Sequence, residues 1–213
     1  MKNLIILGSG GHSKVVGETA SEISTINEIA YLDDKFSNKI FVRKNSLDNK
    51  IIGKIDDIFS SSIRNKYELG FVAIGDNILR KSLFQKLIDL GYTCPNLISS
   101  KASVSPTAII SPGVAIFANA AIQAEVQIGL GTIVNTNAII DHETIISEYT
   151  HICPGVNIAG QVKIGSNCFV GIGSSIIQNI KIGNNVIIGA GSLVIKDIPS
   201  NSKVYGVPAR IVT

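Results

Sequence analysis

Two of the chain's three histidines lie within ten residues of each other, in a segment otherwise poor in charge. His142 stands between Asp141 and Glu143, and His151 follows. Imidazole has an unperturbed pKa of ~6.5, which suits a general base near neutral pH. A neighbouring carboxylate orients the ring and stabilises the imidazolium that forms. The pattern therefore predicts that His142 is a base and Glu143 its partner, with Asp141 the weaker candidate for either role.

An unbroken six-residue repeat surrounds these histidines. From Val104 to Val194 every sixth residue is Val or Ile, sixteen times in succession, and the residue two positions earlier is small or β-branched. No helix has this period, and a plain strand alternates without it. The repeat predicts a parallel β-helix with a stacked aliphatic core. Gly129, Gly165 and Gly183 directly follow an aliphatic residue, so we expect them at corners with positive φ.

The repeated pattern V-x-I-G-x-x resembles the hexapeptide family, whose members fold as left-handed parallel β-helices. The resemblance implies that three hexapeptides form one coil, so residues 18 apart stack on neighbouring coils about 4.8 Å apart. By this spacing Gly160 lies next to His142. A glycine there leaves room for a thioester, and its N–H can bind an oxyanion.

The same spacing aligns two files of residues. One file holds Gly155, Gly173 and Gly191, and the other holds Cys153, Gly171 and Gly189. We expect the two files to form a smooth groove, and the family resemblance implies that it holds the pantetheine arm of coenzyme A. The alternative is that these are ordinary turn glycines.

His151 lies half a coil from His142, so the two cannot share a site within one chain. The family is typically trimeric, with the cofactor between adjacent helices. We therefore expect a homotrimer in which His151 completes the cofactor site of a neighbouring subunit. Asn135, on the preceding coil, is expected to contact the sugar.

The ending KVYGVPARIV resembles the family's closing segment, which implies that Pro208 lies near the adenine of coenzyme A; a capping turn is the alternative.

Charge divides the chain into two predicted domains. Residues 1–98 hold 24 of the 35 charged side chains, so we predict an α/β domain over 1–98 and the β-helix over 99–213. Apolar runs predict strands at 4–7, 28–34 and 71–77, and an amphipathic pattern predicts a helix over 77–92. With a further helix after the first strand, the order is β-α-β-α-β, which indicates a small parallel sheet, half of a Rossmann-like fold.

The segment GSGGHS follows the first strand. Gly8, Gly10 and Gly11 fit a tight turn that brings backbone N–H groups near a phosphate at a helix N-terminus. Asp33 is placed to bind a ribose hydroxyl. About 98 residues form only one mononucleotide-binding half. A single nucleotide is therefore favoured over NAD.

The segments GSGGHSKVV, YLDD and AIGDNILR, ahead of a hexapeptide helix, resemble the nucleotide-sugar acetyltransferases of bacterial surface-glycan synthesis. The resemblance implies acetyl-CoA as donor, a nucleotide-linked 4-amino sugar as acceptor, and sugar binding by the N-terminal domain. Sialic acid O-acetyltransferases are near relatives, so a sugar O-acetyltransferase is the alternative. The matching positions are Gly8, Gly10, His12, Asp33, Asp34, Gly75, Asp76, Asn77 and Arg80.

Composition argues against several other classes of protein. The net charge of +3 is too small to indicate a nucleic-acid partner, and no apolar run approaches the ~20 residues that span a membrane. The three cysteines show no metal spacing, and we expect reduced thiols in a cytoplasmic protein. A catalytically inert scaffold would leave Asp141–Glu143 unexplained. A γ-class carbonic anhydrase would need three zinc-binding histidines, more than His142 and His151 supply.

Overall fold

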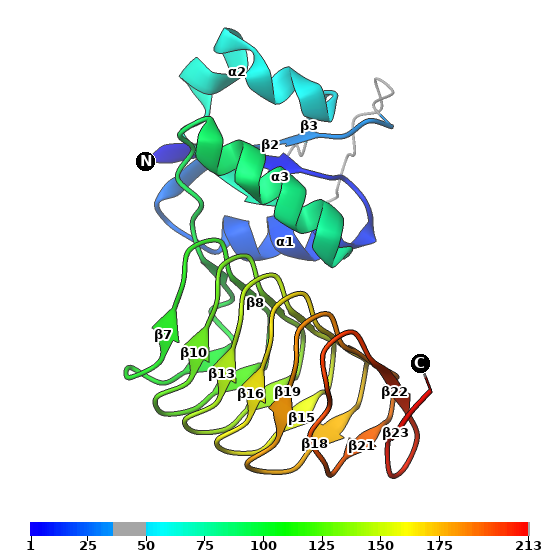
Figure 1. Cartoon of the computed structure of the whole chain (residues 1–213). Coiled ribbons are helices and arrows are strands. Elements are labelled where there is room, and N and C mark those ends of the chain that lie inside the picture. Colours follow the sequence, from blue (N-terminus) through cyan, green and yellow to red (C-terminus); the bar gives the residue numbers. More distant parts are fainter. Residues whose placement is uncertain (36–49, 213) are drawn as a thin grey trace. The chain divides into compact units, whose positions relative to one another are not determined.

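The computed structural model describes residues 1–35 and 50–212. The chain divides into two compact units, Met1–Leu97 and Ile98–Thr213 (Figure 1). The boundary expected after residue 98 lies one residue away. Among the described residues, no helix has the length and apolar character needed to cross a membrane.

The first unit is built on a parallel four-stranded sheet in the order β3-β2-β1-β4. Its apolar strands are fully buried where they cross the centre, as at Leu4 and Leu7. The strands are β1 (Lys2–Leu7), β2 (Ile26–Leu32), β3 (Lys50–Gly53) and β4 (Leu69–Val72). The helices are α1 (Gly11–Ser21), the 3₁₀ helix η1 (Ile55–Phe59), α2 (Ser61–Lys66) and α3 (Asn77–Asp89).

This sheet differs from the expectation in its boundaries and in one extra strand. The strand predicted at 71–77 ends at Val72, because the chain must turn before Asp76 caps α3. The predicted helix ends at Asp89, where Gly91 adopts φ +81°. Strand β3 and helix α2 were not predicted. In β3 only Gly53 is buried, so its sequence carries no alternating apolar signal.

The second unit is a parallel β-helix of two-residue strands in three sheets (Figure 1). One sheet contains β7 (Ile109–Ile110), β10 (Gln127–Ile128), β13 (Ile145–Ile146), β16 (Lys163–Ile164) and β19 (Lys181–Ile182). A second contains β6 (Ser103–Val104), β9 (Ala121–Ile122), β12 (Ile139–Ile140), β15 (Asn157–Ile158), β18 (Ser175–Ile176) and β21 (Leu193–Val194).

The third sheet also receives the closing segment. It contains β5 (Leu97–Ile98), β8 (Ala115–Ile116), β11 (Ile133–Val134), β14 (His151–Ile152), β17 (Phe169–Val170), β20 (Ile187–Ile188), β22 (Lys203–Tyr205) and β23 (Arg210–Ile211). Strand β22 continues the parallel ladder, and β23 folds back antiparallel to it.

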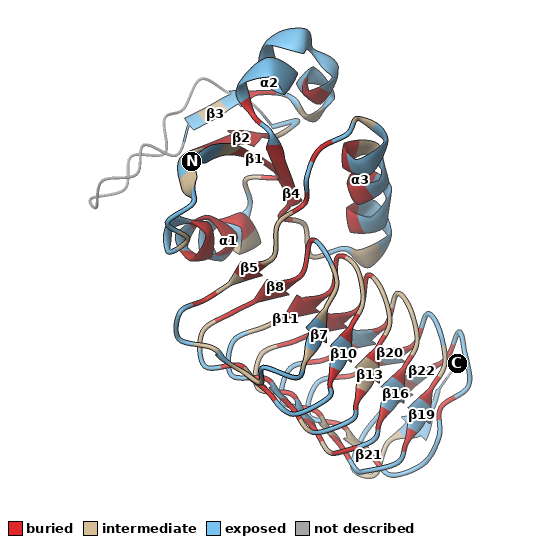
Figure 2. Cartoon of the chain, turned by 90° about the vertical axis from the view of Figure 1, so that its left-hand side faces the viewer, coloured by how far each residue is buried: buried red, intermediate tan, exposed pale blue. Residues whose placement is uncertain are grey.

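The strand register confirms the 18-residue coil. In the three sheets Gln127 pairs with Ile145, Ile133 with His151, and Ile139 with Asn157. The second residue of each strand points inward, and from Ile116 to Val194 none of these side chains is more than 4% exposed. Figure 2 shows these buried positions along the inside of the coil and exposed positions on its outer turns. The predicted stacked core is confirmed.

Gly129, Gly165 and Gly183 correct one expectation. None of them has a positive φ; the left-handed positions lie elsewhere in the repeat, mostly at Asn or another Gly. A Cβ on Gly129 would lie 2.5 Å from the backbone N of Glu148, and one on Gly165 would lie 2.7 Å from the backbone N of Asn184. Glycine is therefore needed at these positions because the neighbouring coil approaches closely, not because of backbone conformation.

Candidate active site

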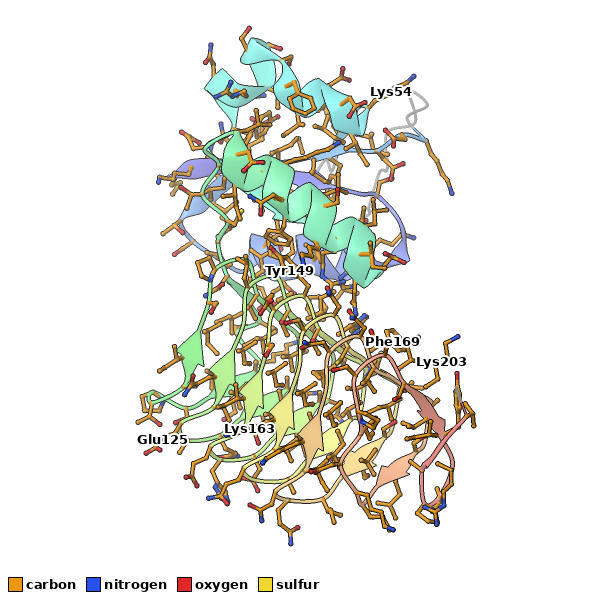
Figure 3. The ribbon with its side chains drawn as sticks, viewed as in Figure 1. Lys54, Glu125, Tyr149, Lys163, Phe169 and Lys203 are labelled. Atoms are coloured by element: carbon orange, nitrogen blue, oxygen red, sulfur yellow. The ribbon has the colours of Figure 1, made fainter. Side chains whose placement is uncertain are left out.

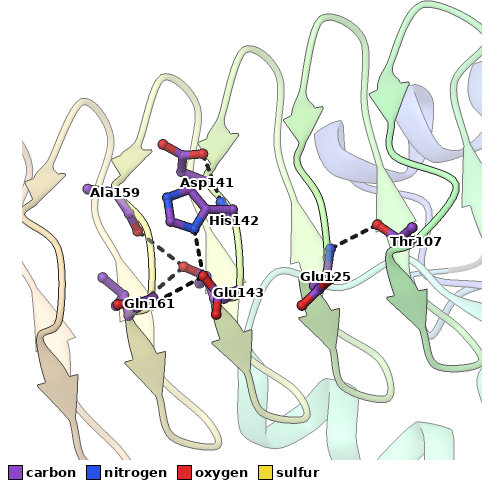
Figure 4. A network of polar contacts seen from close by, with 9 residues as sticks. Thr107, Glu125, Asp141, His142, Glu143, Ala159 and Gln161 are labelled. Carbon is purple, nitrogen blue, oxygen red and sulfur yellow. Dashed lines mark hydrogen bonds and ion pairs between the residues drawn. The ribbon is translucent and has the colours of Figure 1, made fainter.

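The corner between β12 and β13 carries the predicted base and its partner. Asp141 Oδ1 accepts a hydrogen bond from the backbone N–H of His142 at 2.8 Å, which fixes the start of the turn. Glu143 adopts φ +56°, a left-handed conformation that turns the chain into β13. The side chains of His142 and Glu143 are 53% and 48% exposed. Both groups therefore project outward from a rigid coil, where a substrate can reach them (Figure 4).

One carboxylate oxygen organises the polar groups of this corner. His142 Nδ1 lies 3.0 Å from Glu143 Oε2, and Gln161 Nε2 donates to the same oxygen at 3.0 Å. Hydrogen bonds from Gln161 and then from His142 lower the pKa of the Glu143 carboxyl, so it is ionised at neutral pH. An ionised carboxylate only accepts hydrogen bonds, so Nδ1 of His142 carries a proton, and in the neutral ring Nε2 is the nitrogen with the free lone pair.

Gly160 lies directly against the imidazole, as the 18-residue spacing predicts. A Cβ built on Gly160 would stand 2.5 Å from His142 Nε2 and 2.6 Å from Cε1. The Gly160 N–H donates no hydrogen bond to any residue that the structure describes. The corner thus brings the imidazole and the Gly160 backbone together, and the glycine leaves the space that the ring itself fills.

The two glycine files differ from each other. Gly155, Gly173 and Gly191 each have φ +66° and face open space. In the other file, a Cβ on Gly171 would lie 2.6 Å from the backbone N of Ala190, and one on Gly189 would collide with the ring of Tyr205. The open file fits the expected groove, whereas the file through Gly171 is covered and cannot line it.

His151 lies on β14, on a different sheet from the strands that flank His142, and is 8% exposed. Asn135 Oδ1 accepts from Thr136 N at 2.8 Å, which turns Asn135 Nδ2 toward His151 Nε2 at 3.2 Å. Nε2 therefore accepts, and the neutral ring carries its proton on Nδ1. Phe169, which Figure 3 labels, packs edge-on against the ring with 5.3 Å between centroids. Asn135, expected to contact a sugar, also holds the ring of His151.

The glycine turn of the first unit follows β1. Gly8 has φ +99°, and a Cβ there would meet Ile74 Cγ1 at 2.9 Å, so only glycine fits. Gly10 precedes the first turn of α1 and has open space around it. Ser9 donates to Asp33 Oδ2 through its backbone N–H at 2.7 Å and its hydroxyl at 2.8 Å. Asp33, expected to bind a ribose hydroxyl, thus ties down the turn, while exposed Asp34 accepts from Ile55 N at 3.2 Å.

Arg80 is one of the positions at which the resemblance implies nucleotide-sugar binding. Its side chain is only 1% exposed and donates to Ile74 O at 3.1 Å, Gly75 O at 3.1 Å and Asn77 Oδ1 at 2.7 Å. Asp76 Oδ1 accepts from Leu79 N at 2.8 Å and caps α3. Arg80 and Asp76 therefore hold the backbone of the loop between β4 and α3. These bonds suit a role in positioning the loop rather than direct contact with a ligand.

His12 opens α1 and is half-buried. Burial, and then the nearby Arg80 guanidinium, lower its pKa to about 4. His12 is therefore neutral at pH 7 and can donate or accept a hydrogen bond, but it supplies no positive charge.

Pro208, near the other end of the chain, lies in the turn between β22 and β23.

The sequence argument missed Gln161. It stands 18 residues after Glu143, so the period that placed Gly160 next to His142 also placed Gln161 next to Glu143.

Among the described residues, no three His, Cys, Asp or Glu side chains gather in a way that could hold a metal ion.

Comparison with known proteins decides the family. Residues 3–87 match the PglD N-terminal domain, and residues 161–196 match the bacterial transferase hexapeptide (six repeats). The acetyltransferase domain of PglB from Neisseria gonorrhoeae FA1090, solved with acetyl coenzyme A, is 34% identical, covers 99% of both chains and has a TM-score of 0.91. The chain belongs to the hexapeptide-repeat sugar acetyltransferases. The predicted family, fold class and type of enzyme are thereby confirmed.

Two further relatives carry substrates in their names. PerB from Caulobacter crescentus, solved with CoA and GDP-perosamine, is 34% identical over 100% of this chain and 98% of that chain, with a TM-score of 0.89. UDP-N-acetylbacillosamine N-acetyltransferase from Bacillus subtilis is 36% identical over 119 residues, which span 53% of this chain but only 50% of that enzyme. PerB was thus solved with CoA and a nucleotide-linked sugar, the PglB domain with acetyl coenzyme A, and the Bacillus enzyme is named as an N-acetyltransferase of a nucleotide-linked sugar.

Proposed function

We propose that this protein transfers the acetyl group of acetyl-CoA to the amino group of a nucleotide-linked 4-amino sugar in the cytoplasm, for surface-glycan synthesis. The observation that carries the proposal is the arrangement of His142, Glu143 and Gly160. His142 Nε2 lies against the bare backbone of Gly160, and Nδ1 is held by the ionised carboxylate of Glu143.

The reaction follows from these groups. His142 Nε2 accepts a proton from the acceptor amine as the amine nitrogen attacks the thioester carbon. The Gly160 N–H stabilises the oxyanion of the tetrahedral intermediate. When that intermediate collapses, the carbon–sulfur bond breaks, the thiolate leaves and takes up a proton, and the amide remains. Glu143 stabilises the imidazolium formed on the way.

The first unit is the proposed site for the nucleotide-sugar. The Gly8–Gly10 turn leads into the N-terminus of α1, where backbone N–H groups favour a phosphate, and Asp33 and Arg80 hold the two neighbouring loops in shape. His12, Asp34, Gly75, Asp76 and Asn77 border these loops. The names of PerB's ligands and of the Bacillus enzyme support an acceptor of this class.

A homotrimer would complete the site. His151 faces away from the base of its own chain, so it would serve as the cofactor-side group of a neighbour's His142, with Asn135 holding its ring. The open file of Gly155, Gly173 and Gly191 would accommodate the pantetheine arm, and Pro208 would lie toward the adenine. Light scattering at micromolar concentration tests this, and a fully active monomer would contradict it.

His142→Ala is the direct test of the mechanism. General-base catalysis contributes roughly 10²–10⁴ in rate, so kcat should fall by about that factor while the affinity for coenzyme A stays near wild type. Glu143→Gln should lose less, because the imidazole remains. The fold should persist in both, since both side chains are exposed and the core is untouched. Wild-type kcat in the alanine variant at pH 7 would contradict the proposal.

The pH dependence distinguishes an amine acceptor from a sugar hydroxyl, the alternative. At higher pH more of an amine is already deprotonated, so the loss in His142→Ala should shrink. A hydroxyl keeps its proton, so the loss should then shrink far less. The acceptor itself can be found by thermal shift with UDP-, dTDP-, GDP- and CMP-sugars, with and without acetyl-CoA, because ligands of the folded state raise the melting temperature.

A further inference from the structure

We propose that Gln161 is a positioning residue for the base: its side-chain amide holds the Glu143 carboxylate in the orientation that keeps the proton of His142 on Nδ1. This inference rests on the proposed role of His142. Gln161 lies one coil beyond the catalytic corner and would act through Glu143, without touching the substrate.

The contacts form a short chain through a single atom. Gln161 Nε2 and His142 Nδ1 both lie 3.0 Å from Glu143 Oε2. The backbone N–H of Gln161 also donates to the carbonyl oxygen of His142 at 2.9 Å. Gln161 is thus bonded to both members of the pair, and its amide must present Nε2 because the carboxylate only accepts.

Support of this kind is needed because the pair is exposed. With side chains 53% and 48% exposed, His142 and Glu143 are surrounded largely by water rather than by packed neighbours. Water competes for hydrogen bonds, and an unsupported glutamate samples several rotamers. A second donor on the same oxygen removes that freedom. Without it, the His142 proton is free to exchange between the two ring nitrogens.

The backbone at Gln161 points to the same role. Its φ is +60°, a left-handed conformation that favours Gly and Asn over longer side chains. Of the ten non-glycine residues with positive φ in the described chain, six are Asn and one is Tyr149. The other three, Glu125, Glu143 and Gln161, stand in one file, each 18 residues after the last. Asparagine would suit the turn better, but it is one methylene shorter than the glutamine that reaches Glu143 here.

The other charged groups near the corner do not replace this contact. Asp141 accepts the backbone N–H of His142 at 2.8 Å. Glu125, one coil before Glu143, is exposed and its backbone N–H binds Thr107 Oγ1 at 3.1 Å (Figures 3 and 4). Both are carboxylates and cannot donate to Glu143. The donor role falls to Gln161.

Two substitutions separate positioning from shape. Gln161→Asn keeps an amide and suits the left-handed turn, but loses the reach to Glu143. We expect kcat to fall about tenfold, comparable with losing one hydrogen bond to a charged group, with KM for acetyl-CoA unchanged. Gln161→Glu keeps the shape, but an ionised carboxylate cannot donate and repels Glu143, so it should lose more than Gln161→Asn. A role that depends on side-chain shape alone predicts the reverse order, because glutamate has the shape of glutamine and asparagine does not; that order would overturn the proposal.

Nitrogen NMR of the imidazole rings supplies a readout independent of activity. With three histidines in the chain, His142 can be assigned from the His142→Ala spectrum. The wild type should show the proton on Nδ1, and Gln161→Asn should show a mixture with Nε2–H. Asn185→Gly, which changes a left-handed turn at another corner, should leave both kcat and tautomer unchanged.

The outcomes are distinguishable from a failure of the proposed function. An unchanged His142 tautomer in Gln161→Asn overturns the positioning role, whatever the rate. A shifted tautomer together with a fully active His142→Ala variant would support the positioning role while removing the general base from the mechanism.

Discussion

The β-helix corner and the loops of the N-terminal unit place polar groups in opposite ways. At the corner, the side chains of His142 and Glu143 project from the coil and are about half exposed. Gln161 on the next coil donates a hydrogen bond to Glu143. In the loops, Arg80 is buried and binds backbone carbonyls, and Asp33 binds Ser9. The corner therefore exposes the proposed base and its partner, whereas the charges of the loops hold the backbone in place.

The largest expected effect on stability concerns His12. Burial and the Arg80 guanidinium lower its pKa from 6.5 to about 4 in the folded state. Between these pH values the unfolded chain binds a proton that the folded chain does not, so the free energy of unfolding falls as pH is lowered from 6.5 toward 4. The loss attributable to His12 should be about 2–3 kcal/mol between pH 7 and pH 4.5.

Urea unfolding of the wild type and of His12→Gln at these two pH values measures this effect. Glutamine does not titrate, so its variant should lose less stability on acidification, while the carboxylates titrate equally in both proteins. Identical pH dependence would mean that His12 is not held neutral by its surroundings, and the contrast between the loops and the corner would weaken.

Gly160→Ala tests the corner. The backbone of Gly160 is not left-handed, so alanine is tolerated by the chain itself. Its Cβ would stand 2.5 Å from His142 Nε2 and would displace the ring. We expect kcat to fall about 100-fold, because a misplacement of about 1 Å in a reacting group can have that effect. The melting temperature should change little, and wild-type kcat would show that the ring does not need this space.

Arg80→Met tests the loops. The variant loses charge-assisted hydrogen bonds but no longer buries a guanidinium, so the free energy of unfolding should fall by about 2 kcal/mol. KM for the nucleotide-sugar should rise, because the 74–77 loop loses its support, while KM for acetyl-CoA should not change. Lys81→Met, an exposed cation on the same helix, is the matched control. Equal effects of the two substitutions would contradict a positioning role for Arg80.

The same contrast explains what the sequence could predict. In the β-helix a fixed period turns sequence distance into spatial contact, so the neighbourhood of His142 and Gly160 followed from counting by 18, and Gln161 could have been found in the same way. In the N-terminal unit no period exists. The burial of Arg80 depends on the fold of the loop between β4 and α3. The bond between Asp33 and Ser9 likewise depends on how the end of β2 meets the turn after β1. Strand β3 was not predicted for a related reason: only one of its four residues is buried, so its sequence carries no apolar pattern.

The smallest effect separates capping from ligand binding at Asp76. Its Oδ1 accepts from Leu79 N at 2.8 Å, so Asp76→Ala should lower the free energy of unfolding by about 1 kcal/mol. Asparagine caps a helix about as well, so Asp76→Asn should retain nearly all of that stability. The two variants therefore differ in stability but share the loss of the negative charge. If Asp76 only shapes the loop, KM for the nucleotide-sugar in Asp76→Asn should equal that of the wild type. A raised KM in this variant, at unchanged melting temperature, would show that the carboxylate itself meets the ligand, and the loops would then resemble the corner more closely than their hydrogen bonds indicate.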